Sequence, residues 1–90
     1  MTYNPPLEIE FDPAKNASNI AKHGISLVDA DAVFADPNFS AIADSRRAYG
    51  ELRFIGMGVV AGRVLVVVYT MRGVWCRIIS LRKANRREQA

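Results

Sequence analysis

Arginines gather in the C-terminal half of the chain, in a stretch whose apolar pattern predicts a sheet. Arg53, Arg72, Arg77 and Arg82 all belong to this stretch. A guanidinium group stays charged and offers a forked set of donors, and a rigid strand lowers the entropy lost on binding. These side chains are therefore suited to phosphate. A plainer interpretation, in which they are solvated or paired with acids, fits the sequence equally well.

Proton-transfer groups are few. RNA cleavage without metal needs a base for the 2′-hydroxyl proton, cations for the charge on phosphorus, and an acid for the leaving 5′-oxygen. Sheet arginines could supply the cations, and Lys22, His23 or Glu51 could supply the base and the acid. His23 is the single histidine of the chain. Its place at a predicted helix end favours a structural role, because cations stabilise that end, and Glu51 could simply be a charge on an edge strand.

The sequence lacks the motifs of cofactor enzymes. It has no Gly-rich phosphate loop, no paired Cys/His spacing, and no Ser, His and Asp in a recognisable local context. We therefore expect no cofactor and no metal site. Cys76 is the single cysteine, so it cannot form an internal disulfide. We expect it to be a small buried residue, and we expect Tyr69 and Trp75 to pack in the core rather than stack on bases.

Length and charge bound the class of protein. Ninety residues, half of them hydrophobic, predict one domain over residues 1–90. No apolar run approaches the ~18 residues of a membrane span, and the N-terminal residues do not resemble a signal peptide. We expect a cytoplasmic protein that does not bind membranes. Residues 1–44 carry a net charge of −5 and residues 45–90 carry +8, which predicts a basic face for a polyanion or an acidic partner, unless folding interleaves the two halves.

Three apolar segments predict an antiparallel meander. They span residues 53–60, 64–69 and 74–81, with turns at 61–62 and 72–73 where glycine tolerates a positive φ. The continuous apolar run of the middle segment indicates a strand buried on both faces. In a regular third strand, Arg77 would face away from Ser80 and Arg82. Only a bulge would place all three on one face.

The N-terminal half predicts a strand, two helices and a second short strand. Residues 7–11 alternate apolar and acidic, as a half-exposed strand does. A helix should follow Asp12 and end at Gly24, a second should span residues 26–35, and a strand should span 39–43. Residues 2–6 predict a loose tail and 44–50 a polar loop. We expect an α+β fold, with two N-terminal helices packed on an antiparallel sheet and a short basic C-terminal helical tail.

Several motifs together resemble the BrnT family of type II toxins. They are DPAK, a following N, KHG and VFADP in residues 12–37, and RIIS-x-R in residues 77–82. The resemblance covers residues 8–88. It implies a RelE-like fold and a ribonuclease toxin that blocks translation. It also implies a cognate antitoxin of the BrnA kind, with a ribbon-helix-helix region, so that DNA is bound only through the antitoxin complex.

The resemblance also implies site residues. Its catalytic candidates are Lys22 and His23 of KHG, Glu51 and Arg53 of E-x-R, Arg72, and Arg77, Ser80 and Arg82 of RIIS-x-R. We expect the basic residues Lys83, Arg86 and Arg87 to contact RNA. Leu81 stands where the family usually has a small residue. Relatives tend to continue past the position of residue 90 with basic residues and a tyrosine, so a weaker nuclease is expected if that extension contributes.

The sequence also fits two other classes of function. A non-catalytic binding module would use the basic face to grip an acidic segment or a nucleic acid. A DNA-binding repressor that acts alone ranks last, because the predicted second helix carries Asp29 and Asp31 and no basic residue.

Overall fold

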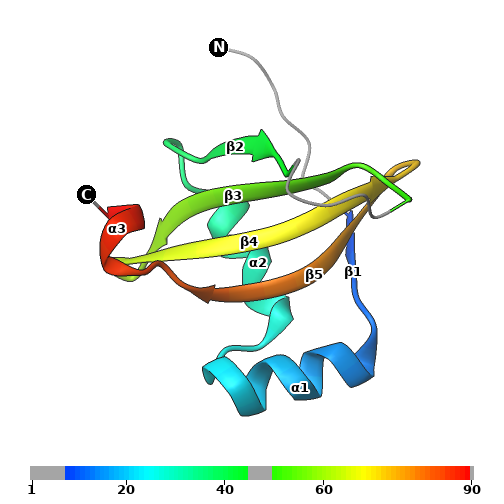
Figure 1. The fold of residues 1–90 in the computed structure, drawn as a ribbon, viewed down its shortest axis with the longest axis horizontal. Coiled ribbons are helices and arrows are strands. Elements are labelled where there is room, and N and C mark those ends of the chain that lie inside the picture. The colour runs from blue at the N-terminus through cyan, green and yellow to red at the C-terminus, as the bar shows by residue number, and fades with distance from the viewer. Residues whose placement is uncertain (1–7, 45–49, 90) are drawn as a thin grey trace.

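The computed structural model describes residues 8–44 and 50–89, so the expected tail at 2–6 and most of the expected loop at 44–50 lie outside the described residues. One five-stranded sheet has the strand order β1-β5-β4-β3-β2. Helices α1 and α2 lie on one side of it, and the other face looks toward the viewer in Figure 1. The elements are β1 (Glu8–Glu10), α1 (Pro13–His23), the 3₁₀ turn η1 (Leu27–Asp29), α2 (Ala30–Phe34), β2 (Ser40–Ala43), β3 (Arg53–Val60), β4 (Arg63–Arg72), β5 (Trp75–Lys83) and α3 (Arg86–Gln89).

Strands β3, β4 and β5 form the predicted antiparallel meander. Ala61 and Gly62 make the first turn with φ of 51° and 79°, the positive values that a two-residue turn of the I′ type requires. The second turn is Gly73-Val74, one residue later than predicted. Gly73 takes the first central position with φ of 62°, so Val74 belongs to the turn and not to the strand.

The caps of α1 confirm the predicted helix. Asp12 accepts a hydrogen bond from the Ala14 amide at 2.8 Å, and Pro13 opens the helix. Gly24 ends it in the left-handed conformation with φ of 72°, while its N–H donates to the carbonyl of Ile20. These local signals act within one turn of the chain, which is why the sequence alone located both ends.

Two features of the predicted fold class are wrong. The expected second helix is not continuous, because Ser26 caps a 3₁₀ turn and only residues 30–34 form α2. The sheet is also not purely antiparallel, since β1 pairs with β5 in parallel. The fold is therefore a mixed α+β arrangement with one full-length helix, two short helices and a mixed sheet. No helix among the described residues is long and apolar enough to cross a membrane.

The core lies between the helices and one face of the sheet. Leu27, Ala30 and Val33 are fully buried there. They pack against the sheet residues Leu65, Val67, Ile78 and Leu81. The approach is close enough that a Cβ atom at Gly58 would lie 2.6 Å from the carbonyl oxygen of Val33. The segment of the expected second helix therefore contributes core residues, although its backbone is not one α-helix.

Tyr69 and Cys76 confirm their predicted burial, whereas Trp75 does not. Tyr69 stacks on Phe54 at 5.4 Å between ring centroids and packs against the core. Burial raises the pKa of the Cys76 thiol to about 11. Trp75 is 43% exposed, because it precedes the buried Cys76 on a regular part of β5 and so lies on the opposite face of the sheet from the core.

Candidate functional site

A β-bulge interrupts β5 in the middle of the sheet. Val68 of β4 pairs with Ser80, but the next residue, Tyr69, pairs with Ile78. Ile79 is therefore an extra residue without a partner position on β4. Such an insertion reverses the alternation of side chains along the bulged strand.

The bulge places the predicted site residues of β5 on one face. Cys76 and Ile78 before the bulge and Leu81 after it are all buried in the core. The residues between them point to the opposite face of the sheet, away from the core, and we call this the open face. This open face therefore carries Arg77, Ser80 and Arg82.

The strand register aligns further residues beside Arg77. Arg53 of β3 pairs with Thr70 of β4, and Thr70 pairs with Arg77 of β5. On the far side of Arg77, Glu10 of β1 pairs with it in parallel register. We call Arg53, Thr70 and Arg77 the arginine row. Its two guanidinium stems rise from strands about 10 Å apart, twice the usual spacing of neighbouring strands.

Carboxylates accompany the arginines of this region. Glu51 lies between two of them, with Oε1 3.8 Å from Arg53 Nε and Oε2 3.4 Å from Arg72 Nη2. Glu10 Oε1 lies 3.6 Å from Arg77 Nη1. All these side chains keep some exposure to solvent, and such pairs typically contribute only about 0–1 kcal/mol. An incoming phosphate could therefore replace a carboxylate at modest cost.

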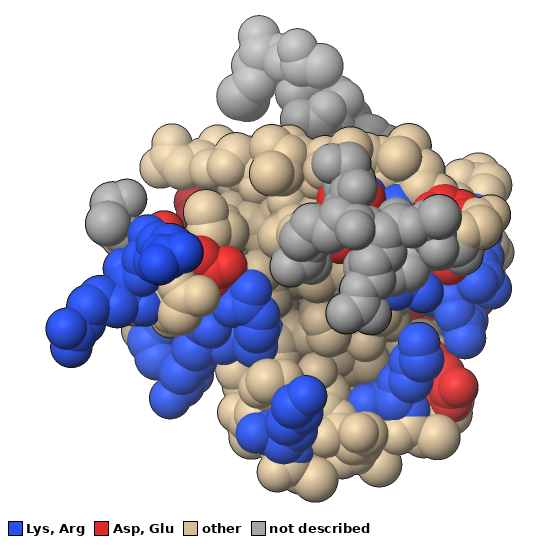
Figure 2. All heavy atoms as spheres, in the orientation of Figure 1, with Lys and Arg blue, Asp and Glu red and all other residues tan. Residues whose placement is uncertain are grey.

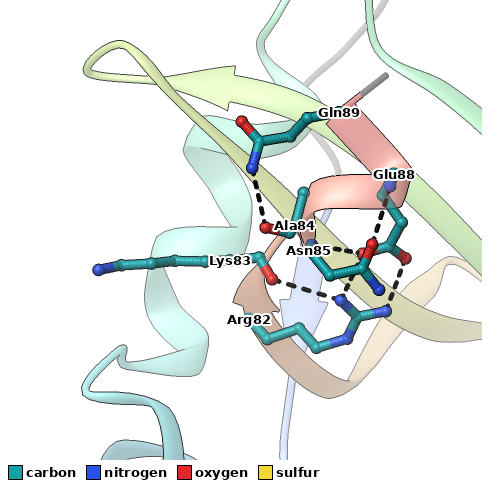
Figure 3. A network of polar contacts seen from close by, with 6 residues as sticks. All are labelled: Arg82, Lys83, Ala84, Asn85, Glu88 and Gln89. Carbon is teal, nitrogen blue, oxygen red and sulfur yellow. Dashed lines mark hydrogen bonds and ion pairs between the residues drawn. The ribbon is translucent and has the colours of Figure 1, made fainter.

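Arg82 lies at the other end of β5, four β4 positions from the arginine row, and α3 holds it there. Its Nη1 and Nη2 atoms donate to the two carboxylate oxygens of Glu88 at 2.7 and 2.8 Å (Figure 3). Glu88 also accepts from the Asn85 amide, and its own amide donates to Asn85 Oδ1, both at 2.8 Å. This reciprocal capping box explains why a helix of only four residues forms at this point.

An open pocket lies between α1 and the bulged part of β5. Its volume is about 190 Å³. Two lysines, a histidine and two hydroxyl groups line it, and no Asp or Glu of the described chain does. The lining residues are Lys15, Ser18, Asn19, Lys22, His23, Ile79 and Ser80. We call this the α1–β5 pocket.

Asn19 fixes the wall of the α1–β5 pocket. Its side chain is 6% exposed and forms a pair of hydrogen bonds with the backbone of Leu81, donating to the carbonyl at 2.8 Å and accepting from the amide at 3.1 Å. It also donates to the carbonyl of Ile25 at 2.8 Å. Because β1 pairs with β5 only along residues 75–77, Asn19 satisfies the edge of β5 where β1 does not reach.

The structure brings together many, but not all, of the predicted site residues. Lys22, His23 and Ser80 meet in the α1–β5 pocket, and Glu51 joins Arg53 and Arg72 beside the arginine row. Figure 2 shows Lys and Arg at both ends of this view of the molecule and over α1, with acidic atoms among them at both ends. The RNA-contact candidates are more scattered. Lys83 extends away from Arg82 in Figure 3, and Arg86 and Arg87 are exposed on α3.

Sequence reasoning did not identify Lys15, Ser18 and Asn19. Lys15 and Lys22 are seven residues apart and Ser18 lies between them, so all three face the same side of a helix. That spacing was a usable signal. Asn19 had no such signal, because an asparagine within a helix gives no indication of a partner 62 residues away.

The metal-ligating residue types do not form a cluster in the described ranges, 8–44 and 50–89. No group of three or more His, Cys, Asp or Glu side chains there could hold a metal ion. The charged groups of the candidate site are lysine and arginine cations, and carboxylates pair with the arginines.

Comparison with known proteins identifies the family. No curated protein matches the chain. A family model described as the ribonuclease toxin BrnT of type II toxin-antitoxin systems matches residues 11–88. This range includes every strand of the sheet except β1, as well as the arginine row and the α1–β5 pocket. The chain therefore belongs to the BrnT family of ribonuclease toxins of type II toxin-antitoxin systems.

Proposed function

We propose that this protein is a metal-independent endoribonuclease that inhibits translation by cutting RNA, and that the open face of its sheet is the active surface. The observation that supports this most is the bulge at Ile79. It turns Arg77, Ser80 and Arg82 to one face and brings Ser80 beside Lys22 and His23. A regular strand would separate these groups.

The proposed reaction is attack by a ribose 2′-oxygen on the neighbouring phosphorus. A base removes the 2′-hydroxyl proton, the 2′-oxygen bonds to phosphorus, and the bond to the 5′-oxygen breaks as an acid protonates it. The products are a 2′,3′-cyclic phosphate and a 5′-hydroxyl end. Arg53, Arg72, Arg77 and Arg82 would stabilise the charge that builds on the phosphate. Lys22, His23 and Glu51 are the candidates for base and acid.

The proposal extends to fold, partner and location. We propose that the fold is RelE-like and that the protein acts in the cytoplasm. An antitoxin of the BrnA kind, with a ribbon-helix-helix region, would mask the toxin and carry the complex to DNA. Lys83, Arg86 and Arg87 would add contacts to RNA outside the reacting centre.

Purified, partner-free protein tests the nuclease activity directly. Wild type should cleave an RNA oligonucleotide in the presence of a chelator, and an Arg77→Ala/Arg82→Ala variant should be slower by a factor on the order of 10² or more. Arg63→Ala is the matched control, because Arg63 is an exposed arginine of β4 at the turn that follows β3. In cells, induced wild type should slow growth and degrade RNA. Equal growth with intact RNA for wild type and the double variant would refute the proposal.

One observation favours a second candidate function. Each of the four arginines has a carboxylate partner, as expected for a surface that is held in shape for binding rather than for catalysis. A non-catalytic module would form a stable complex with an acidic partner segment or a nucleic acid and leave RNA uncut. A defined cleavage product from purified wild type would exclude this function.

A further inference from the structure

We infer that the α1–β5 pocket is a subsite that binds one phosphate group of the RNA backbone next to the phosphate that reacts. The inference relies on the proposed function for the identity of the substrate. It assigns RNA contacts to Lys15 and Ser18, and it makes Lys22 a binding residue as well as a proton-transfer candidate. Three properties of the pocket support it: its charge, its size and its position.

No carboxylate of residues 8–44 or 50–89 compensates the cations of the pocket. Lys15, Lys22 and His23 form no ion pair within the described part of the chain. The end of α1 contributes about half a negative charge, which the two lysines outweigh. The pocket therefore presents net positive charge to an external anion, in contrast to the paired arginines of the sheet.

The size of the pocket suits a phosphate group. The pocket has a volume of about 190 Å³ and is open to solvent, so it holds several water molecules. Pockets for drug-sized ligands usually have volumes of about 300–1,000 Å³. A phosphate with part of its hydration fits this space, which is smaller than a typical pocket for a drug-sized ligand.

The hydroxyl groups and the rigid wall complete the chemistry. Ser18 and Ser80 offer O–H donors from opposite sides of the pocket, one from α1 and one from β5. The side-chain amide of Asn19 is hydrogen-bonded to the backbone of Leu81 and Ile25. It therefore keeps the two walls at a fixed separation, and a preformed site of this kind loses less entropy on binding.

The pocket also borders the proposed active surface. Ser80 is both a wall of the pocket and part of the open face, where it lies between Arg77 and Arg82 along β5. An RNA strand bound along these arginines would pass the mouth of the pocket. The next phosphate of the strand is thus the anion closest to it.

Salt-dependent binding tests this inference. The probe is a fully 2′-O-methyl RNA oligonucleotide, which the proposed reaction cannot cleave, and the readout is the slope of log K against log salt by fluorescence anisotropy. Each phosphate contact to a single strand contributes about 0.7 to this slope. Lys15→Gln and Lys22→Gln should each reduce the slope by up to about 0.7, and the double variant, which removes the one phosphate contact of the pocket, should reduce it by about 0.7. Arg63→Gln removes the same charge from the β3–β4 end of the sheet and should leave the slope unchanged.

The outcomes separate the subsite from the nuclease activity. Equal slopes for wild type, Lys15→Gln and Lys22→Gln, or an equal loss in Arg63→Gln, would overturn the inference. Reduced slopes in a protein whose wild type does not cut unmodified RNA would refute the nuclease proposal and leave the phosphate site standing. Thermal unfolding by circular dichroism checks that the variants fold, and we expect it to be unchanged because both lysines are exposed.

Discussion

The arginine row and the α1–β5 pocket hold positive charge in two different ways. Arg53 and Arg77 of the row, and Arg72 beside it, pair with Glu51 or Glu10 at 3.4–3.8 Å. The lysines of the pocket have no carboxylate partner among the described residues, and their position depends on Asn19, which joins α1 to β5. The first region pairs its cations with carboxylates, and the second presents cations that have no such partner among the described residues.

The difference suggests a division of labour on one surface. Paired guanidinium groups attract a distant polyanion weakly, because each field is cancelled nearby, but they are already oriented when a phosphate displaces the carboxylate. Unpaired lysines attract the polyanion from further away. We therefore expect the pocket to control affinity and its salt dependence, and the arginine row to control the rate of the chemical step.

The largest expected effect comes from Asn19, because it is the buried link between the two regions. Asn19→Ala leaves the Leu81 amide and two carbonyls without their partner, and each buried group that loses its bond costs about 1–3 kcal/mol. Unfolding in urea should show a free energy lower by about 3 kcal/mol. Asn16→Ala is the control: its side chain bonds the Leu27 amide at a partly exposed site and should cost only about 1 kcal/mol. Equal losses in the two variants would contradict the role given to Asn19.

A smaller effect is expected from freeing the arginines. Glu51→Gln removes the charge that Arg53 and Arg72 share, so the binding of 2′-O-methyl RNA should tighten several-fold, while stability should change by less than about 1 kcal/mol. Glu10→Gln should act in the same direction on Arg77 alone and more weakly. Weaker RNA binding in both variants would show that these carboxylates help to bind RNA instead of masking the arginines.

A pH-dependent effect concerns the face of β5 beneath the arginine row. Burial raises the pKa of the Cys76 thiol from its ordinary value near 9 to about 11. Between pH 9 and pH 11, therefore, the thiol loses its proton in the unfolded chain but keeps it in the folded chain. Stability should therefore fall as pH rises from 9 to 11. Urea midpoints at pH 8 and pH 10.5 should differ more for wild type than for Cys76→Ala. An equal difference would mean that the thiol is not shielded from water.

The sequence predicted those parts of the fold that depend on local signals. Asp12, Pro13 and Gly24 bounded α1, and the glycines of the turns located the meander within one residue. The second helix was misjudged because its apolar spacing is satisfied equally well by a 3₁₀ turn followed by five helical residues. The parallel pairing of β1 with β5 depends on contacts between distant segments, which spacing alone does not reveal.

The site was predictable in its residue types but not in its geometry. The alternation of side chains along β5 showed that only a bulge would place Arg77, Ser80 and Arg82 on one face. The sequence around Ile79 does not mark it as the extra residue, because the position of a bulge depends on the register with β4. The carboxylate partners of the arginines come from β1, from the segment just before β3 and from α3. Such pairs become visible only when these elements are placed side by side.

The most direct test of the account is an NMR titration of the full chain with 2′-O-methyl RNA. If the bulge creates one RNA-binding surface, backbone shifts should concentrate at Arg77, Ser80, Arg82 and Lys22, with little change along α2. Shifts that concentrate on α2 or the free edge of β2, with β5 unchanged, would contradict the claim that the bulged strand carries the active surface.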